Sequence, residues 1–208
     1  MRFLKLLSLA GLVFILTQCY PDGPEYYDEM DIVYSNYNAG YNFKANKTFA
    51  IPSKIVKLDG TLVSGGTPNY VNSVYADPML AKIKQNMVNY GWTEVDISDT
   101  PDVTLAPSAI ETTTIYYYDY WYYWDWWYGG YYPPGGWYYP YYTVEGYTTG
   151  SLLVVMVNPN ILTPDDKKTA VWTFVVNGLM EGSSTEFTSR FTKAIDQAFT
   201  QSPYLKIN

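Results

Sequence analysis

The sequence predicts an α+β fold: a two-layer sandwich in which two helices cover one face of a mostly antiparallel sheet of about five strands. Two segments carry a single apolar face at helical spacing, so each needs a flat surface against which to bury it. Several other segments are rich in valine, threonine and aromatic residues, which favour strands. Because most of these strands lie between the two helices in the chain, one sheet supplies the surface that both helices need.

The first predicted elements are a short strand and a helix. Thr48 to Ile51 has the composition of a strand and is closed by Pro52. Asp77-Pro78 predicts a helix start, with an acidic N-cap and proline at the first helical position. Gly91 predicts a left-handed stop. The apolar face of this helix consists of Leu80, Ile83, Met87 and Tyr90.

Two strands are predicted before the longest insertion of the chain and two after it. The first pair is Trp92 to Val95 and Val103 to Ile115, the second of which we expect to be interrupted or bulged near Pro107. The second pair is Thr143 to Val157 and Ala170 to Met180.

The second pair predicts the centre of the sheet. Leu152 to Val157 is apolar on both faces, which is typical of a central strand. Asn158-Pro159 and residues 164–168 are polar and turn-forming, so they predict the exposed connection of a long hairpin.

A second helix closes the predicted fold. Ser183 and Glu186 have the spacing of a capping box, and Pro203 ends the helical pattern. The apolar stripe of this helix consists of Phe187, Phe191, Ala194, Ile195, Ala198 and Phe199.

The N-terminus resembles a bacterial lipoprotein signal. Arg2 and Lys5 precede a short apolar stretch that ends at Cys19, which is the only cysteine of the chain. We therefore expect residues 1–18 to be a signal peptide, Cys19 to carry lipid, residues 19–31 to be a tether, and residues 32–208 to form one domain. The predicted location is the cell envelope, anchored in the outer membrane. The alternative is an ordinary cleaved signal with a cysteine nearby.

Charge and composition exclude several classes of function. The net charge of −7 becomes −9 when Arg2 and Lys5 leave with the signal, and so acidic a chain is unsuited to nucleic acid. The chain has no histidine, which removes the commonest general base and metal ligand. We therefore predict a protein that is not an enzyme and holds no metal or cofactor.

Seven short segments, from about residue 31 to 205, carry a family resemblance through their order and spacing. The segments are Tyr41-Asn-Phe43, Lys47-Thr-Phe-Ala50, Asn89-Tyr-Gly91, Pro101-Asp102-Val103, Gly150-Ser-Leu-Leu-Val154, Ala170-Val-Trp172, and Ile195 with Gln201-Ser-Pro203. In this order they resemble the bacterial envelope lipoproteins grouped as domain of unknown function 4136, in a Bacteroidetes-type member. The resemblance implies a small α/β lipoprotein domain of the envelope with no established activity, and it transfers no catalytic residue.

Residues 116–142, here called the aromatic segment, are the most unusual part of the chain. They comprise 13 Tyr and 5 Trp, with Gly, Pro and two Asp, and they form an insertion between two predicted strands. At about 150 Å² a ring, they present roughly 2,700 Å². Half of that still exceeds the roughly 300–600 Å² of the largest apolar patch on a typical monomer. The candidate binding residues are Tyr118, Tyr120, Trp121, Trp124, Trp126, Trp127, Trp137 and Tyr139.

Four interpretations of the aromatic segment remain open. It folds over the free face of the sheet, forms a protein or self-association surface, stacks on envelope glycans, or lies at a membrane interface. A membrane-spanning role is excluded because Asp119, Asp125 and the prolines would lie in hydrocarbon. Stacking on nucleic acid is excluded because the segment has no Lys or Arg.

The carboxylates give weaker signals. Asp96, Asp99 and Asp102 recur at three-residue spacing, but the spacing is that of turns and caps rather than of a calcium loop. The adjacent pair Asp165 and Asp166 is interpreted in the same way.

One pair of carboxylates supports an alternative function. Glu111 and Glu145 flank the aromatic segment and, if they faced each other, would resemble a glycosidase pair. The leading prediction is nevertheless a lipid-anchored, non-catalytic binding or scaffolding domain that contacts an envelope protein or glycan through the aromatic segment. The alternatives are a carboxylate-dependent enzyme on envelope polysaccharide and a structural homo-oligomer.

Overall fold

Four long antiparallel strands form the centre of the fold in the computed structural model. The model describes residues 32–58, 68–110, 137–138, 150–162, 164, 168–177 and 184–208, all within one compact unit, Asp31–Asn208. The long strands lie side by side in the order β1 (Ile32–Tyr37), β8 (Lys168–Asn177), β7 (Ser151–Leu162) and β5 (Val103–Ile110). Every pairing among these four is antiparallel.

Short strands extend the sheet through parallel pairings. β2 (Thr48–Ala50) and β3 (Val56–Leu58) both pair with β5, and β4 (Thr93–Glu94) pairs with β2. β6 (Trp137–Tyr138) pairs with β8. The sheet of the described residues thus has eight strands rather than about five; its long pairings are antiparallel, as predicted, and the short strands make it mixed.

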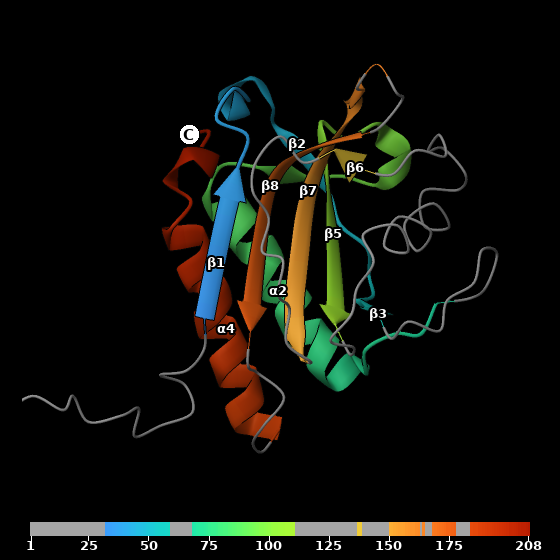
Figure 1. The fold of residues 1–208 in the computed structure, drawn as a ribbon, viewed down its shortest axis with the longest axis vertical. Coiled ribbons are helices and arrows are strands. Elements are labelled where there is room, and N and C mark those ends of the chain that lie inside the picture. The colour runs from blue at the N-terminus through green and yellow to red at the C-terminus, as the bar shows by residue number, and fades with distance from the viewer. Residues whose placement is uncertain are drawn as a thin grey trace, which may run out of the picture. The chain divides into compact units, whose positions relative to one another are not determined.

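Both helices of the described residues cover the same face of the sheet, which confirms the predicted α+β class. α2 (Ser73–Asn89) and α4 (Ser184–Thr200) lie behind the strands in Figure 1 and pack against each other. Three short 3₁₀ turns, η2 (Phe43–Ala45), η3 (Ile97–Asp99) and η4 (Pro203–Leu205), complete the fold.

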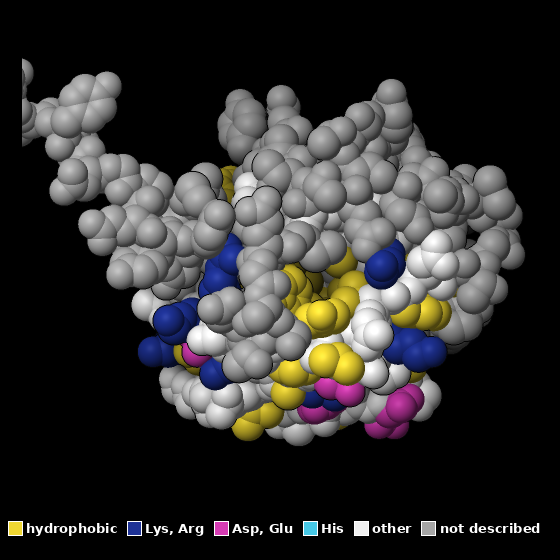
Figure 2. All heavy atoms as spheres, turned by 90° about the horizontal axis from the view of Figure 1, so that it is seen from below, with side chains coloured by type: hydrophobic (Ala, Val, Ile, Leu, Met, Phe, Trp, Pro, Cys, Tyr) yellow, Lys and Arg dark blue, Asp and Glu magenta, His cyan; other side chains and the backbone are white. Residues whose placement is uncertain are grey.

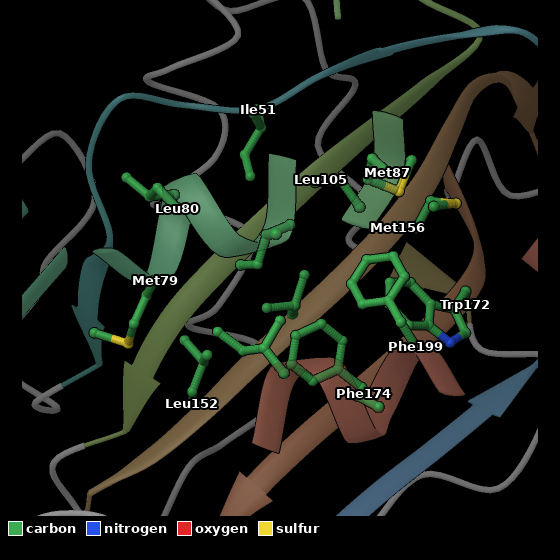
Figure 3. Packing of buried hydrophobic residues seen from close by; sticks show 14 of the residues in the cluster. Ile51, Met79, Leu80, Met87, Leu105, Leu152, Met156, Trp172, Phe174 and Phe199 are labelled. Atoms are coloured by element: carbon green, nitrogen blue, oxygen red, sulfur yellow. The ribbon is translucent and has the colours of Figure 1, made fainter. Parts of the chain in front are cut away.

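The core between sheet and helices is built on large aromatic side chains. Phe199 of α4 packs edge-on against Trp172 of β8, with ring centroids 5.2 Å apart, and also contacts Phe174 (Figure 3). The Trp172 indole N–H donates to Ser202 Oγ at 3.0 Å, so this buried polar atom is satisfied. The predicted apolar faces of both helices line this core, with Phe187 and Tyr90 partly buried at its margin.

The start of α2 differs from the prediction. The helix begins at Ser73, where the Asn72 side chain caps the Val74 N–H at 3.0 Å, and Pro78 stands in the second turn. The Asp77-Pro78 signal is local, whereas burial of Ala76 against the core favours the earlier start. The predicted stop at Gly91 is confirmed, with a φ of +98°. The Gly91 N–H donates to Val88 O and the Trp92 N–H donates to Met87 O, which together form a Schellman motif.

Two strand boundaries also differ from the prediction. Pro107 causes no interruption, because it lies in register opposite Val154 in the β5–β7 ladder. On the other edge of β5, pairing with β2 ends at Thr104 and pairing with β3 begins at Ser108, so Pro107 lies beside a gap where an N–H is not needed.

The hairpin connection begins later than predicted. β7 continues through Asn158-Pro159 to Leu162, and it does so through register shifts that accommodate the proline. The predicted capping box of the last helix, at Ser183, lies outside the described residues, as do 111–115, 143–149 and 178–180 at the ends of the predicted strands.

Candidate functional site

The aromatic segment belongs to a long connection whose two ends lie next to each other. β5 ends at Ile110, β7 begins at Ser151, and these two residues pair across the strands. Gly150 adopts a left-handed φ of +89°, and its N–H donates to Ile110 O at 2.7 Å. Figure 2 views this end of the sheet and shows hydrophobic side chains gathered in its middle, with charged side chains toward the rim.

One point within the connection is fixed at the opposite end of the sheet. Trp137 and Tyr138 form β6, which pairs in parallel with Lys168 and Thr169 at the start of β8. Among the candidate binding residues, only the Trp137 backbone is described. The other candidates lie outside the described residues, as do Cys19, Glu111, Glu145, Asp165 and Asp166.

The sheet face opposite the helices, here called the second face, is buried. On β7 it presents Leu153, Val155 and Val157, which are at most 5% exposed. The registers place Ala106 of β5 and Thr173 of β8 on either side of Val155, and both are also buried. No helix of the described residues lies over this face, because α2 and α4 both pack on the other one.

Small and hydroxyl-bearing side chains distinguish the second face. Thr104, Ala106, Ser108 and Thr173 are all nearly inaccessible to solvent. The Ser108 hydroxyl has no hydrogen-bond partner among the described residues. Such a buried, unpaired hydroxyl needs an explanation, since leaving it unsatisfied costs about 1–3 kcal/mol.

The three regularly spaced aspartates accept hydrogen bonds from backbone N–H groups, as expected for turns and caps. Asp96 and Asp99 form a capping box at η3, and hydrogen bonds from the Ser98 N–H and hydroxyl lower the pKa of Asp96. Asp102 accepts from the N–H groups of Lys47 and Thr48 at 2.8 and 2.9 Å and from the Thr48 hydroxyl at 2.9 Å. These carboxylates hold turns and strand ends together.

The pKa of Asp102 reflects a balance of opposing effects. Its partial burial raises the pKa, but the three hydrogen bonds and the charge of Lys47 outweigh this, so the pKa lies below the ordinary value. Asp102 is therefore ionised at neutral pH and is unsuited to act as a general acid. Within the described residues, no three His, Cys, Asp or Glu side chains meet in a way that could hold a metal ion.

An aromatic cluster that the sequence did not reveal lies beside the start of the last 3₁₀ turn. Tyr37 of β1 stacks on Tyr204 with ring centroids 3.6 Å apart, and Tyr41 packs edge-on against Phe43 at 4.8 Å. The Tyr41 hydroxyl accepts from Asn158 Nδ2 at 2.8 Å. Burial raises the pKa of Tyr41 and of Tyr204, so both phenols stay neutral at physiological pH and serve packing. Its residues come from three segments far apart in the chain, residues 37–43, 158 and 204, which no local pattern connects.

A membrane span formed by a helix is not found in the described part of the chain: no helix there combines the necessary length and apolar character.

Comparisons with known proteins identify the fold. The model of a family described as domain of unknown function DUF4136 matches residues 33–204. A crystal structure of a DUF4136 family protein from Bacteroides thetaiotaomicron is similar, with a TM-score of 0.66 and 31% identity, covering 86% of this chain and 98% of that one. The match to a PelC dodecamer from Paraburkholderia phytofirmans has 10% identity and a TM-score of 0.39, covering 86% of this chain and 100% of that one. No curated protein matches the chain.

Proposed function

The chain belongs to the DUF4136 family, and from this premise we propose that it is a lipid-anchored, non-catalytic binding domain of the cell envelope. The aromatic segment is the binding surface, and the partner is an envelope protein or glycan. The lipid is carried by Cys19 and holds the domain at the outer membrane.

The area of the aromatic segment is the observation that carries this proposal. Its 18 rings amount to roughly 2,700 Å² at about 150 Å² each. Tyr and Trp combine a large contact area with few rotatable bonds, so they bind at low entropic cost. Together with glycine and proline, this composition is typical of a recognition surface rather than of a regular strand or helix.

The chemistry of the remaining chain supports binding rather than catalysis. The sequence contains no histidine, and its only cysteine is the one assigned to lipid. Asp96, Asp99 and Asp102 are engaged by backbone N–H groups, and the titratable tyrosines with shifted pKa values are all raised by burial. These aspartates and tyrosines are therefore unsuited to act as a general acid or an activated nucleophile.

A ring-deletion experiment tests the binding role. In the full chain carrying Cys19→Ser, which removes the proposed lipid anchor, Trp126→Ala combined with Trp127→Ala should weaken retention on isolated envelope fractions about 10-fold or more, because each indole is a candidate binding residue. The matched control is Val74→Ala with Val88→Ala on α2, since these side chains are 65% and 54% exposed and carry no predicted role. Equal retention of both double variants would refute binding through these indoles.

Treatment of the fractions separates the partner classes. Protease digestion should abolish retention if the partner is a protein and leave it intact if the partner is a glycan. If retention depends on neither, sedimentation of the full chain and its double variant decides whether the rings bind a second copy.

A mass measurement tests the anchor. The mature protein should begin at Cys19 and carry fatty acids, and Cys19→Ser should move it from the membrane pellet to the soluble fraction. A protein that still begins at Met1, or one that is trimmed but carries no fatty acid, would refute the lipid anchor at Cys19. Neither result would bear on the binding role of the aromatic segment.

A further inference from the structure

We propose that the outer edge of β1 is an interface at which two copies of this chain pair strand to strand. The two β1 strands run antiparallel about a twofold axis, so that the two sheets join into one. This inference concerns Ile32–Tyr37 and the helix beneath them, and it rests neither on the binding role of the aromatic segment nor on the lipid anchor. It places self-association at a defined strand of the fold.

The outer edge of β1 is open. β1 is the last strand on its side of the sheet and pairs with β8 (Figure 1). Backbone groups along an antiparallel strand point alternately to its two sides. The Asn38 N–H donates to Val171 O at 3.0 Å, so the even-numbered residues of β1 point to β8 and the odd-numbered ones point outward. The outward N–H and C=O groups of Val33 and Ser35 therefore have no hydrogen-bond partner among the described residues.

A side chain closes this edge at the end of the strand. The Tyr37 N–H also points outward, but it donates to Asn36 Oδ1 at 2.9 Å. Tyr37 is the last residue of β1, so this N–H needs no partner from another strand. The open part of the edge consists of Val33 and Ser35, each with one N–H donor and one C=O acceptor.

β1 lacks the features that usually keep an edge strand from pairing with another chain. Such features are charged side chains, proline, bulges and very short length. Ile32–Tyr37 has six residues, none of which is charged or a proline, and its register with β8 is continuous. Its isoleucine, valine and tyrosines favour strands. An edge of this kind is a template for a further strand.

The opposite side of the sheet shows the usual protection. β4 has only two residues, and its Glu94 forms an ion pair with Lys84 of α2. The outer side of β3 is occupied by residues 69 and 70, because the Lys57 N–H donates to Asn69 O at 2.8 Å and Val56 and Tyr70 form a β-bridge. The open edge of β1 is therefore a specific feature of this strand.

A second copy fits the open edge because the pattern is complementary to itself. With Tyr34 of both copies on the twofold axis, Val33 of each copy lies opposite Ser35 of the other. Each of these two pairs exchanges two N–H···O bonds, so every outward group of Val33 and Ser35 finds a partner. Tyr37, whose N–H is already bonded, then lies beyond the start of the other β1. The pairing thus uses the whole open edge and ends where the edge is closed.

The side chains next to the axis bring no like charges together. Tyr34 lies on the second face, since its neighbour Val33 packs against the helix-side core, and the two Tyr34 rings become direct cross-strand neighbours. On the helix side, the Ser35 hydroxyl donates to Gln201 Oε1 at 3.5 Å, directly after α4. Gln201 and Gln197, one turn earlier, are exposed and uncharged. The helix layers therefore meet through neutral side chains near the axis.

Substitutions at Ser35 test the pairing, because the Ser35 N–H points outward and the β1–β8 ladder does not use it. The full chain carrying Cys19→Ser should show a concentration-dependent equilibrium between monomer and dimer in sedimentation. Ser35→Pro removes the outward N–H, and two symmetry-related bonds are lost, so the dissociation constant should rise about 10-fold or more. Proline is tolerated on an edge strand where its nitrogen faces solvent.

Ser35→Ala is the matched control. It keeps the outward N–H and removes only the hydroxyl, so its dissociation constant should stay within about threefold of the parent value. A parent that remains monomeric at millimolar concentration would overturn the proposal. A dimer that Ser35→Pro leaves as strong as Ser35→Ala does would overturn it as well.

Single cysteines test the register, and they decide the question if Ser35→Pro does not fold. In the chain carrying Cys19→Ser, Tyr34→Cys places two thiols on the axis with Cα atoms about 4.5 Å apart, which a disulfide can bridge. Asn36→Cys is the matched control on the same face, with its two thiols about 13 Å apart along the strands. Mild oxidation should therefore link the Tyr34→Cys copies much faster than the Asn36→Cys copies, and equal rates would contradict the register.

Amide exchange distinguishes this edge from self-association through another surface. On dilution of the Cys19→Ser chain, the Val33 and Ser35 amides should lose protection, whereas those of Tyr34 and Asn36, which face β8, should keep it. A dimer whose Val33 and Ser35 amides exchange equally fast at every concentration would form elsewhere, and the proposal would be wrong. No envelope fraction is present, so this result is independent of the proposed binding role.

Discussion

The two faces of the central strands are equally buried but differently built. On the helix side, β8 presents Trp172 and Phe174, whose rings interlock with Phe199 of α4. On the second face the same strand presents Thr173 and Val175. Large side chains fill the wedges between cylindrical helices and a twisted sheet, whereas small ones leave a smooth surface.

This difference suggests that the size of the side chains on each face of a sheet depends on the shape of the layer that covers it. Helices touch a sheet along ridges, so the sheet must supply bulk between them. The alternation of large and small residues along β8 therefore matches the helices that cover one face of the sheet.

The largest expected effect is on the helix side. Phe174→Ala removes a ring that contacts both Trp172 and Phe199, and it should lower the free energy of unfolding by about 3–5 kcal/mol. Urea denaturation measures the loss, with Val88→Ala at an exposed position of α2 as a control expected within about 0.5 kcal/mol of the parent. A loss below about 1 kcal/mol would mean that this core is not tightly packed.

A matched pair on β7 compares the faces directly. Val154→Ala and Val155→Ala delete the same atoms from neighbouring residues that are both 0% exposed, so each should cost about 2 kcal/mol. A much smaller loss for Val155→Ala would indicate that the second face is shielded from water but loosely packed.

A change in the sheet itself should affect both faces. Asp102 joins the start of β5 to β2 through three accepted hydrogen bonds, so Asp102→Asn should cost about 1–2 kcal/mol. Because the folded-state pKa of Asp102 is lowered, its contribution is present above the unfolded-state pKa of about 3.9 and is lost as the pH falls through the folded-state value. Unfolding midpoints between pH 7 and pH 3 should fall less steeply for the variant, with a residual slope because the pKa of Asp96 is also lowered. Identical slopes would contradict this role.

The sequence was most informative where periodicity and capping act locally. The apolar faces of both helices, the Gly91 stop and the central place of Leu152 to Val157 were predicted because each depends on residues close together in the chain. β3 and β6 were missed because each is too short to have a clear period, and β1 was missed because it is stabilised by pairing with a distant strand. Pairing across such distances also explains why Pro107 is tolerated within β5 and why the Tyr41–Asn158 contact was not foreseen.

The smallest predicted effect probes the second face through a single hydroxyl. If Ser108 stays unpaired, Ser108→Ala removes a buried polar group at no loss of hydrogen bonds and should raise stability by up to about 1 kcal/mol. Urea denaturation gives the sign of the change. A loss of stability would contradict an unpaired hydroxyl, because only the removal of a satisfied group breaks a hydrogen bond.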